Sequence, residues 1–156
     1  MKKNSRSLAR YLSVQAVYQQ IEASLNYHQV LNEFSNWHLD NISIDFENII
    51  NPDIIKVDKL YFNKIFEKQN ARNKFIESLI KKNLRNDWSL ESLPILLRSI
   101  LKVAISEMIV SPDLPIGVIT TEYIILTETF FVENESSFVN ALIEKVHLQL
   151  KKPNNE

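Results

Sequence analysis

Four basic side chains stand at the start of the chain and could bind a polyanion. Lys2, Lys3, Arg6 and Arg10 are the only charged groups among the first ten residues. Arg6 and Arg10 are one helical turn apart, so together they can contact neighbouring phosphates of a nucleic acid. Positive charge is unfavourable at a helix N-terminus, which indicates a polyanion held nearby. The alternative is a solvated basic tail that binds nothing.

A second basic pair lies on a segment that is otherwise apolar. Arg98 and Lys102 are four residues apart and share a narrow polar strip with Ser106, beside Glu107. Like charges one turn apart repel each other slightly. The pair should therefore be neutralised by an acid, exposed in a groove or used to bind a ligand, and pairing with an acid is the commoner outcome.

The chemistry of catalytic and metal sites is missing from this sequence. The chain has no Cys and one Gly, Gly117, which argues against thiol chemistry and glycine-rich phosphate loops. His28, His38 and His147 do not have the spacing of metal ligands. We therefore predict a protein that is not an enzyme and needs no cofactor.

The formal net charge of −1 hides large local imbalances. Residues 1–10 carry four bases and no acid, residues 11–55 six acids and no base, and residues 56–102 eleven bases against five acids. Residues 103–144 carry seven acids and no base, and residues 145–156 have a net charge of +2. Such alternation indicates partners of opposite charge, unless the blocks cancel one another in the fold.

Hydrophobic periodicity predicts helices along most of the chain. Residues 93–109 are apolar nearly all round, which predicts a buried central helix. Residues 40–57 show no clear period and predict a loop or broken helices. Asn4 or Ser5, Ser92 and Asn134 are the expected N-caps. The predicted helices are 5–25, 27–39, 58–84, 93–109, a fifth ending near 131 and a sixth from about 134 to 150, with a short helical turn at 88–91.

These elements predict an all-α fold, a single compact domain of six to seven helices over residues 1–156. Its ends are expected to be a flexible basic arm, 1–5, and a flexible tail, 152–156. The most hydrophobic stretch, 108–132, is interrupted by charges and two prolines, and no targeting segment is visible. We expect a cytoplasmic protein that does not enter a membrane, and its apolar helix stripes also allow a homodimer.

A series of motifs resembles the NusB transcription antitermination family. The resemblance rests on the order and spacing of short segments over most of the chain: Arg6-Ser7-Leu8-Ala9-Arg10, Val14-Gln15-Ala16-Val17-Tyr18, Asp58-Lys59-Leu60-Tyr61-Phe62, Trp88-Ser89-Leu90-Glu91-Ser92-Leu93-Pro94, Arg98 to Glu107, Asp113-Leu114-Pro115 with Val118 and Glu122, and Phe138-Val139-Asn140. It implies an all-helical, non-enzymatic protein.

The resemblance also implies partners and the residues that bind them. It implies pairing with the ribosomal protein NusE, binding of single-stranded boxA RNA in ribosomal RNA leader transcripts, and an antitermination complex with RNA polymerase that reads through terminators. The implied RNA-binding residues are Lys2, Lys3, Arg6, Arg10, Arg98 and Lys102. Those that form or support the NusE face are Tyr18, Glu107, Glu122, Phe138, Val139 and Asn140. Phe138 and Val139 can equally be core residues, and Asn140 a residue on the polar face of its helix.

Departures from the family pattern leave a second hypothesis open. Ser7 and Leu8 stand where arginines are common, and Ser137 replaces the lysine before the Phe-Val-Asn motif. These changes predict RNA binding that is weaker or more dependent on NusE. The alternative is a NusB-related protein-interaction module with weakened or lost RNA binding. A third reading, a helical domain like those fused to RNA cytosine methyltransferases, would lack its catalytic domain here.

Overall fold

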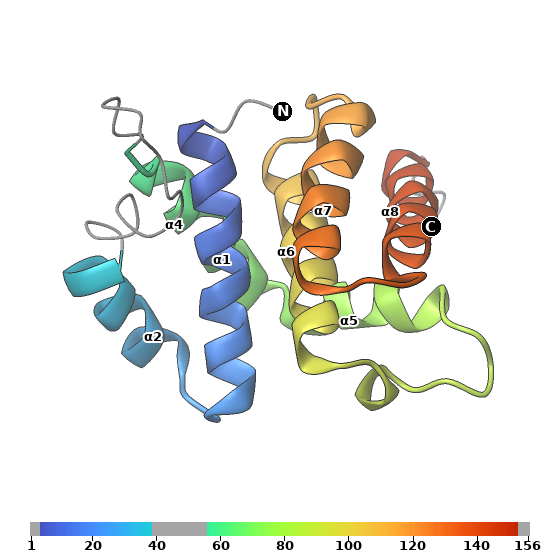
Figure 1. Ribbon diagram of the computed structural model, residues 1–156, viewed down its shortest axis with the longest axis horizontal. Coiled ribbons are helices and arrows are strands. Elements are labelled where there is room, and N and C mark those ends of the chain that lie inside the picture. Colours follow the sequence, from blue (N-terminus) through green and yellow to red (C-terminus); the bar gives the residue numbers. More distant parts are fainter. Residues whose placement is uncertain (1–3, 39–55, 153–156) are drawn as a thin grey trace.

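The computed structural model describes residues 4–38 and 56–152, and within these ranges every regular element is a helix (Figure 1). The predicted all-α class is confirmed. The α-helices are α1 (Ser5–Glu22), α2 (Tyr27–Glu33), α4 (Lys59–Ala71), α5 (Asn73–Lys82), α6 (Ile95–Val110), α7 (Ile116–Phe130) and α8 (Glu135–Lys151). A π-helical turn, η1 (Phe34–His38), extends α2, and a 3₁₀ turn, η2 (Leu90–Ser92), precedes α6.

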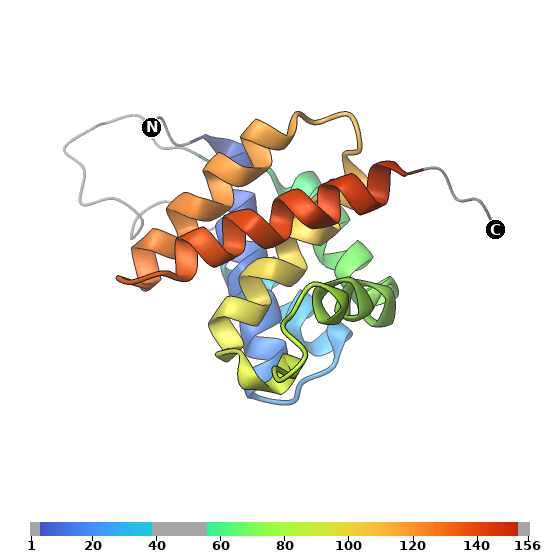
Figure 2. The ribbon, with the colours of Figure 1, turned by 90° about the vertical axis from the view of Figure 1, so that its right-hand side faces the viewer.

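Helix α6 is the centre of the molecule, as its apolar sequence predicted. Every residue from Ser99 to Met108 is buried. Its neighbours are α1, α4, α5, α7 and α8. Figure 1 shows α1, α2 and α4 on one side of α6, and Figure 2 shows α7 and α8 packed together on the other. Burying a helix on all sides requires apolar residues on all faces, which is what this segment supplies.

Helices α1 and α4 run parallel beside α6. Their N-terminal ends lie side by side, where the Asp58 amide donates to the Ser5 carbonyl at 3.2 Å. Near their other ends, Val17 of α1 and Gln69 of α4 line the same cavity. Side chains that project from the same level of α1 and α4 therefore lie near one another.

A cluster of stacked aromatic rings holds α2 and η1 against α4. The ring centroids of Phe34 and Phe62 are 5.8 Å apart, those of Phe62 and Phe66 are 5.7 Å apart, and those of Phe66 and Tyr27 are 5.1 Å apart. Phe34, Phe62 and Phe66 are fully buried. This cluster supplies the apolar contact that fixes the short helix α2, which has only seven residues.

The predicted single helix over 58–84 is wrong, because the chain breaks at Arg72. Arg72 has φ −112° and ψ 23°, and it separates α4 from α5. Asn70 and Asn73 flank the break, and asparagine competes with the helix by bonding locally. The break turns α5 so that Ile76 and Ile80 are buried.

One of the three expected N-caps forms a side-chain cap bond, and the other two do not. Asn4 caps α1, accepting from the Ser7 amide at 2.8 Å, as predicted. Asn134 precedes α8 but makes no side-chain cap bond. Ser92 is not the N-cap of α6. Its Oγ bonds Ser89, and α6 begins at Ile95, directly after Pro94.

Several expected boundaries shift. Helix α1 ends at Glu22, three residues before the predicted end, and Ser24 then takes a left-handed φ of 53°. The helix predicted over 27–39 divides into α2 and η1. Asn4 and Ser5 belong to the cap and first turn of α1 rather than to a flexible arm. Residues 1–3, positions 40–55 of the irregular segment predicted over 40–57, and the tail from 153 lie outside the described residues. None of the described helices has the length and apolar character needed to cross a membrane.

The aromatic cluster predicts a large effect of truncating Phe62. Phe62→Ala should lower the free energy of unfolding by about 3–5 kcal/mol, because it opens a cavity between the Phe34 and Phe66 rings. The matched control is Leu148→Ala on α8, which is 63% exposed and should change stability by less than about 0.5 kcal/mol. Urea denaturation measures both, and equal losses in the two variants would contradict the assignment.

Candidate functional site

Arg6 is the predicted RNA-binding residue of α1 that the structure leaves at the surface. Its side chain is half exposed, with Nε 4.0 Å from Asp58 Oδ2 and the guanidinium 4.2 Å above the Tyr61 ring. A surface ion pair of this length is weak, so an incoming phosphate can replace the carboxylate. Lys2 and Lys3 lie outside the described residues.

Arg10 is not available to a ligand in this structure. The residue is 3% exposed and points inward between α6 and α7. Its Nε lies 2.7 Å and its Nη2 2.8 Å from the two oxygens of Glu107, and Nη1 bonds Glu122. Both carboxylates already use the donors of Arg10, and contact between Arg10 and RNA stays a prediction.

Two tyrosines complete a buried polar cluster around Arg10. The Tyr61 hydroxyl donates to Glu107 Oε2, and the Tyr123 hydroxyl donates to Glu107 Oε1 at 2.7 Å. Burial raises the pKa of Tyr123 well above its usual value, and the nearby Glu107 charge adds to the effect. Burial alone would lower the pKa of Arg10, but its hydrogen bond and charge interaction with Glu107 raise it above the usual value. Arg10 and the tyrosines thus keep their protons at neutral pH.

Lys102 is also buried and paired, which is the outcome that the sequence favoured. It is 4% exposed, and its Nζ lies 2.8 Å from Glu77 Oε2 and 3.0 Å from Asn73 Oδ1. Arg98 is half-buried, and its Nε makes no hydrogen bond among the described residues. Lys102 lines a cavity at the far end of α1 from Arg6, so Arg6 and Lys102 do not share one basic face.

Tyr18 lies in an apolar groove between α1, α6 and α7. The residue is 38% exposed, and the groove has a cavity volume of about 410 Å³. Its other walls include Tyr11, Leu96 and Phe130, and the Tyr11 and Phe130 rings stack with centroids 6.4 Å apart. The exposed carboxylate of Glu22 stands at the rim. Exposed aromatic rings beside a carboxylate suit a protein partner with basic side chains.

A second apolar cavity, of about 400 Å³, surrounds Phe138. The Phe138 and Trp88 rings lie 6.0 Å apart, and Pro94 and Leu97 form another wall. Both cavities border the first turn of α6, since Leu96 lines one and Leu97 the other. We refer to the two cavities together as the apolar surface around the start of α6.

The remaining predicted partner residues offer less surface. Glu107, Glu122 and Val139 are buried, and Asn140 is half-buried. The three buried residues present little surface that a partner could touch. The burial of Val139 is what the alternative reading of this residue as a core residue predicted.

Sequence reasoning missed several residues of this apolar surface, among them Tyr11, Trp88 and Phe130. One signal was present for Tyr11, which precedes Tyr18 by seven residues and therefore shares its helix face. For Trp88 and Phe130 the sequence gives no signal, because their exposure depends on where α7 and the η2 turn end. No group of three or more His, Asp or Glu residues within 4–38 and 56–152 could hold a metal ion.

The cluster around Arg10 predicts a stability effect that separates it from Arg6. Arg10→Met should lower the free energy of unfolding by about 3–5 kcal/mol, since it leaves two carboxylates without their cation in the interior. Arg6→Met removes the same charge from a half-exposed site and should cost less than about 1 kcal/mol. Chemical denaturation compares the two, and a loss at Arg10 as small as that at Arg6 would show that the cluster is not stabilising.

Comparison with known proteins gives one consistent family. A model of the NusB family matches residues 7–147. The transcription antitermination protein NusB of Allorhizobium ampelinum is 32% identical over 150 residues, which is 96% of this chain and 90% of that protein. The NusB protein of Novosphingobium aromaticivorans is 30% identical over 142 residues, covering 91% of this chain and 92% of that one.

Solved structures agree in fold. A structure of Thermotoga maritima NusB superposes with a TM-score of 0.74 at 22% identity, covering 95% of this chain and 94% of that one. A structure of antitermination factors NusB and NusE in complex with double-stranded RNA gives 0.71 at 20% identity, covering 92% and 96%. The family match over most of the chain, the similar relatives and the shared fold lead to one conclusion: the chain belongs to the NusB family.

Proposed function

We propose that this protein is a transcription antitermination adaptor that pairs with the ribosomal protein NusE, binds boxA-type RNA and promotes read-through by RNA polymerase. The observation that carries the proposal is the family match over residues 7–147, since the similar relatives are antitermination proteins. The structure of a similar protein, bound to NusE and RNA, supports both partners. In this role the protein is a cytoplasmic, non-enzymatic adaptor.

The partner face that we propose is the apolar surface around the start of α6, including Tyr18 and Phe138. Its two cavities accept apolar side chains, and their edges carry the acids Glu22 and Glu135. More acids lie nearby in sequence, at the exposed positions Glu128 and Glu133. A basic ribosomal protein would be attracted to this surface and would bury its exposed aromatic rings.

The RNA contribution of α1 is smaller than the sequence suggested. Of the two arginines on this helix, Arg6 alone is exposed, and Arg10 serves the interior. RNA affinity should therefore depend on NusE, which adds its own charge to the complex. The burial of Arg10 and Lys102 is the observation that favours the alternative, a protein-interaction module with weakened or lost RNA binding.

An RNA-binding assay distinguishes these two functions. We expect a short boxA-like RNA to bind weakly alone and more tightly with NusE, with affinity falling steeply as salt rises. Arg6→Gln should reduce the slope of log affinity against log salt by about 1, because one phosphate contact is lost. Arg85→Gln, at an exposed site after α5, is the charge-matched control and should leave the slope unchanged. Absence of any RNA complex at low salt, with NusE present, would favour the alternative.

Binding of NusE tests the apolar face separately. Tyr18→Ser should weaken NusE binding by about tenfold, because the exposed ring lines the groove and aromatic anchors dominate interfaces. Leu148→Ser removes an exposed apolar side chain from α8 and should not change the affinity. Isothermal titration calorimetry measures both variants. Equal affinities for wild type and Tyr18→Ser would remove this face from the proposal.

A further inference from the structure

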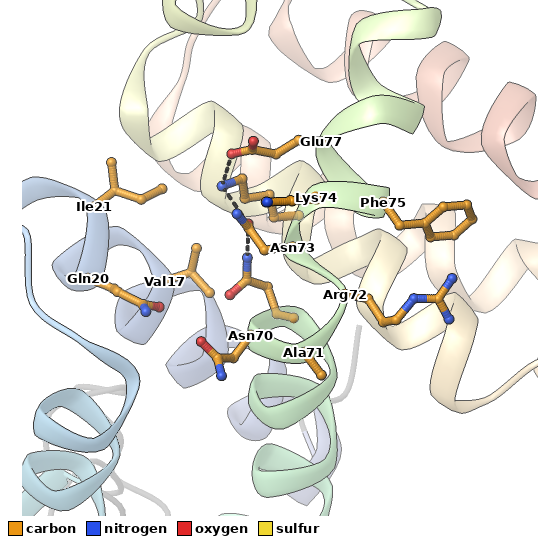
Figure 3. Close-up of a pocket in the computed structure, with 12 residues that line it drawn as sticks. Val17, Gln20, Ile21, Asn70, Ala71, Arg72, Asn73, Lys74, Phe75 and Glu77 are labelled. Carbon is orange, nitrogen blue, oxygen red and sulfur yellow. Dashed lines mark hydrogen bonds and ion pairs between the residues drawn. The ribbon is translucent and has the colours of Figure 1, made fainter.

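A polar cavity lies between the end of α1 and the junction of α4 and α5 (Figure 3). Its volume is about 730 Å³, which is within the range of sites that hold small organic groups. Val17 and Ile21 of α1 form an apolar wall, and Gln20 extends beside them. The opposite wall carries the amides of Asn70 and Asn73. The cavity is distinct from the two apolar cavities around the start of α6.

The buried ammonium of Lys102 fixes the orientation of the amides. An ammonium group can only donate, so its 3.0 Å contact requires the oxygen of Asn73, not the nitrogen, to face it. Gln69 must then donate to this same oxygen, which it does through Nε2 at 2.8 Å. Glu77 holds the other side of the ammonium at 2.8 Å. Figure 3 shows this chain of contacts beside α1.

This arrangement leaves one acceptor and one donor without a partner. Gln69 Oε1 and Asn73 Nδ2 make no hydrogen bond among the described residues, and neither atom is sealed from solvent, so both are open to a ligand. A nucleobase presents both donors and acceptors on its Watson–Crick edge, so a cavity lined by a free acceptor and a free donor can pair with it. The apolar wall of α1 supplies a surface for the base, and the amides supply its polar contacts.

The mouth of the cavity favours a phosphate. Lys74 is exposed there and makes no ion pair within 4–38 and 56–152. The first turn of α5 has no side-chain cap, so its backbone N–H groups add partial positive charge. Arg72 and Phe75 stack at 4.4 Å and point away from α1 (Figure 3), which leaves the side facing α1 open. Base-sized space, amide edges and an electropositive mouth together describe a nucleotide site.

We propose that this cavity binds an unpaired nucleotide of single-stranded RNA, with Lys102 as the positioning residue of its amide wall. The inference rests on the proposed RNA-binding function and adds to it a second point of contact, far from Arg6. Lys102 would then contribute to RNA binding as the sequence predicted, through the amides that it orients rather than by meeting a phosphate.

Isosteric substitutions in the cavity test this proposal on the full chain. The double variant Gln20→Glu with Asn70→Asp adds two negative charges to the cavity walls without changing their shape. We expect it to lower the affinity for a short single-stranded boxA-like RNA by about tenfold or more, because the charges repel the phosphate. The control, Gln29→Glu with Asn32→Asp, makes the same change at exposed positions of α2 and should alter affinity by less than about twofold. Fluorescence anisotropy measures binding, and circular dichroism checks that each variant is folded.

The outcomes separate this proposal from the proposed function. If the wild type fails to bind RNA with or without NusE, the proposed function is wrong, and this proposal falls with it. If the wild type binds and the two double variants lose affinity equally, the cavity is not the site and the proposed function stands. Photo-crosslinking with RNA that contains 4-thiouridine should give adducts within 69–74, and adducts confined to other segments would overturn the proposal. Saturable binding of adenosine monophosphate, with no effect of the cavity variant on RNA, would assign the cavity to a free nucleotide instead.

Discussion

A single buried ion cluster fixes the relative positions of four helices in this protein. Arg10 of α1 lies between the carboxylates of Glu107 on α6 and Glu122 on α7, and Tyr61 of α4 donates to Glu107. Charges taken out of water are stable only when every partner stays in place, so the cluster allows one arrangement of the four helices. That arrangement also sets the position of Arg6, whose guanidinium rests on the outer face of the Tyr61 ring.

The same need to neutralise buried charge decides which cations remain for a ligand. Arg10 and Lys102 belong to the interior, each held by acids from other helices. The surface instead offers Arg6 at one end of α1, and at the other end an amide-lined cavity with the exposed Lys74 at its mouth. Lys102 still shapes that cavity, because an ammonium can only donate and therefore fixes which atoms of the neighbouring amides stay free. The apolar surface around the start of α6 lies apart from both and is suited to a protein partner.

Parts of the fold and site could be predicted because they depend on local pattern. The central position of α6 follows from residues that are apolar on all faces, and the cap at Asn4 follows from a short side chain before an amphipathic run. The break at Arg72 could not be predicted, since the apolar period is plausible on both sides of it. The exposure of Tyr18 was implied by resemblance alone, whereas that of Phe130 depends on the end of α7 beside α1.

The sequence by itself determined the helical class, the buried central helix, the absence of thiol chemistry and the motifs of the family. Only the tertiary structure decided what each charge does. Arg10 and Glu107 are 97 positions apart in the chain, and Lys102 and Glu77 are 25 apart. Periodicity tells which face of a helix a side chain occupies, but not which face of another helix it meets. The strength of an ion pair depends on distance and burial in three dimensions. The sequence alone therefore suggests that Arg10 binds RNA, whereas in the fold Arg10 is a buried cation paired with Glu107 and Glu122.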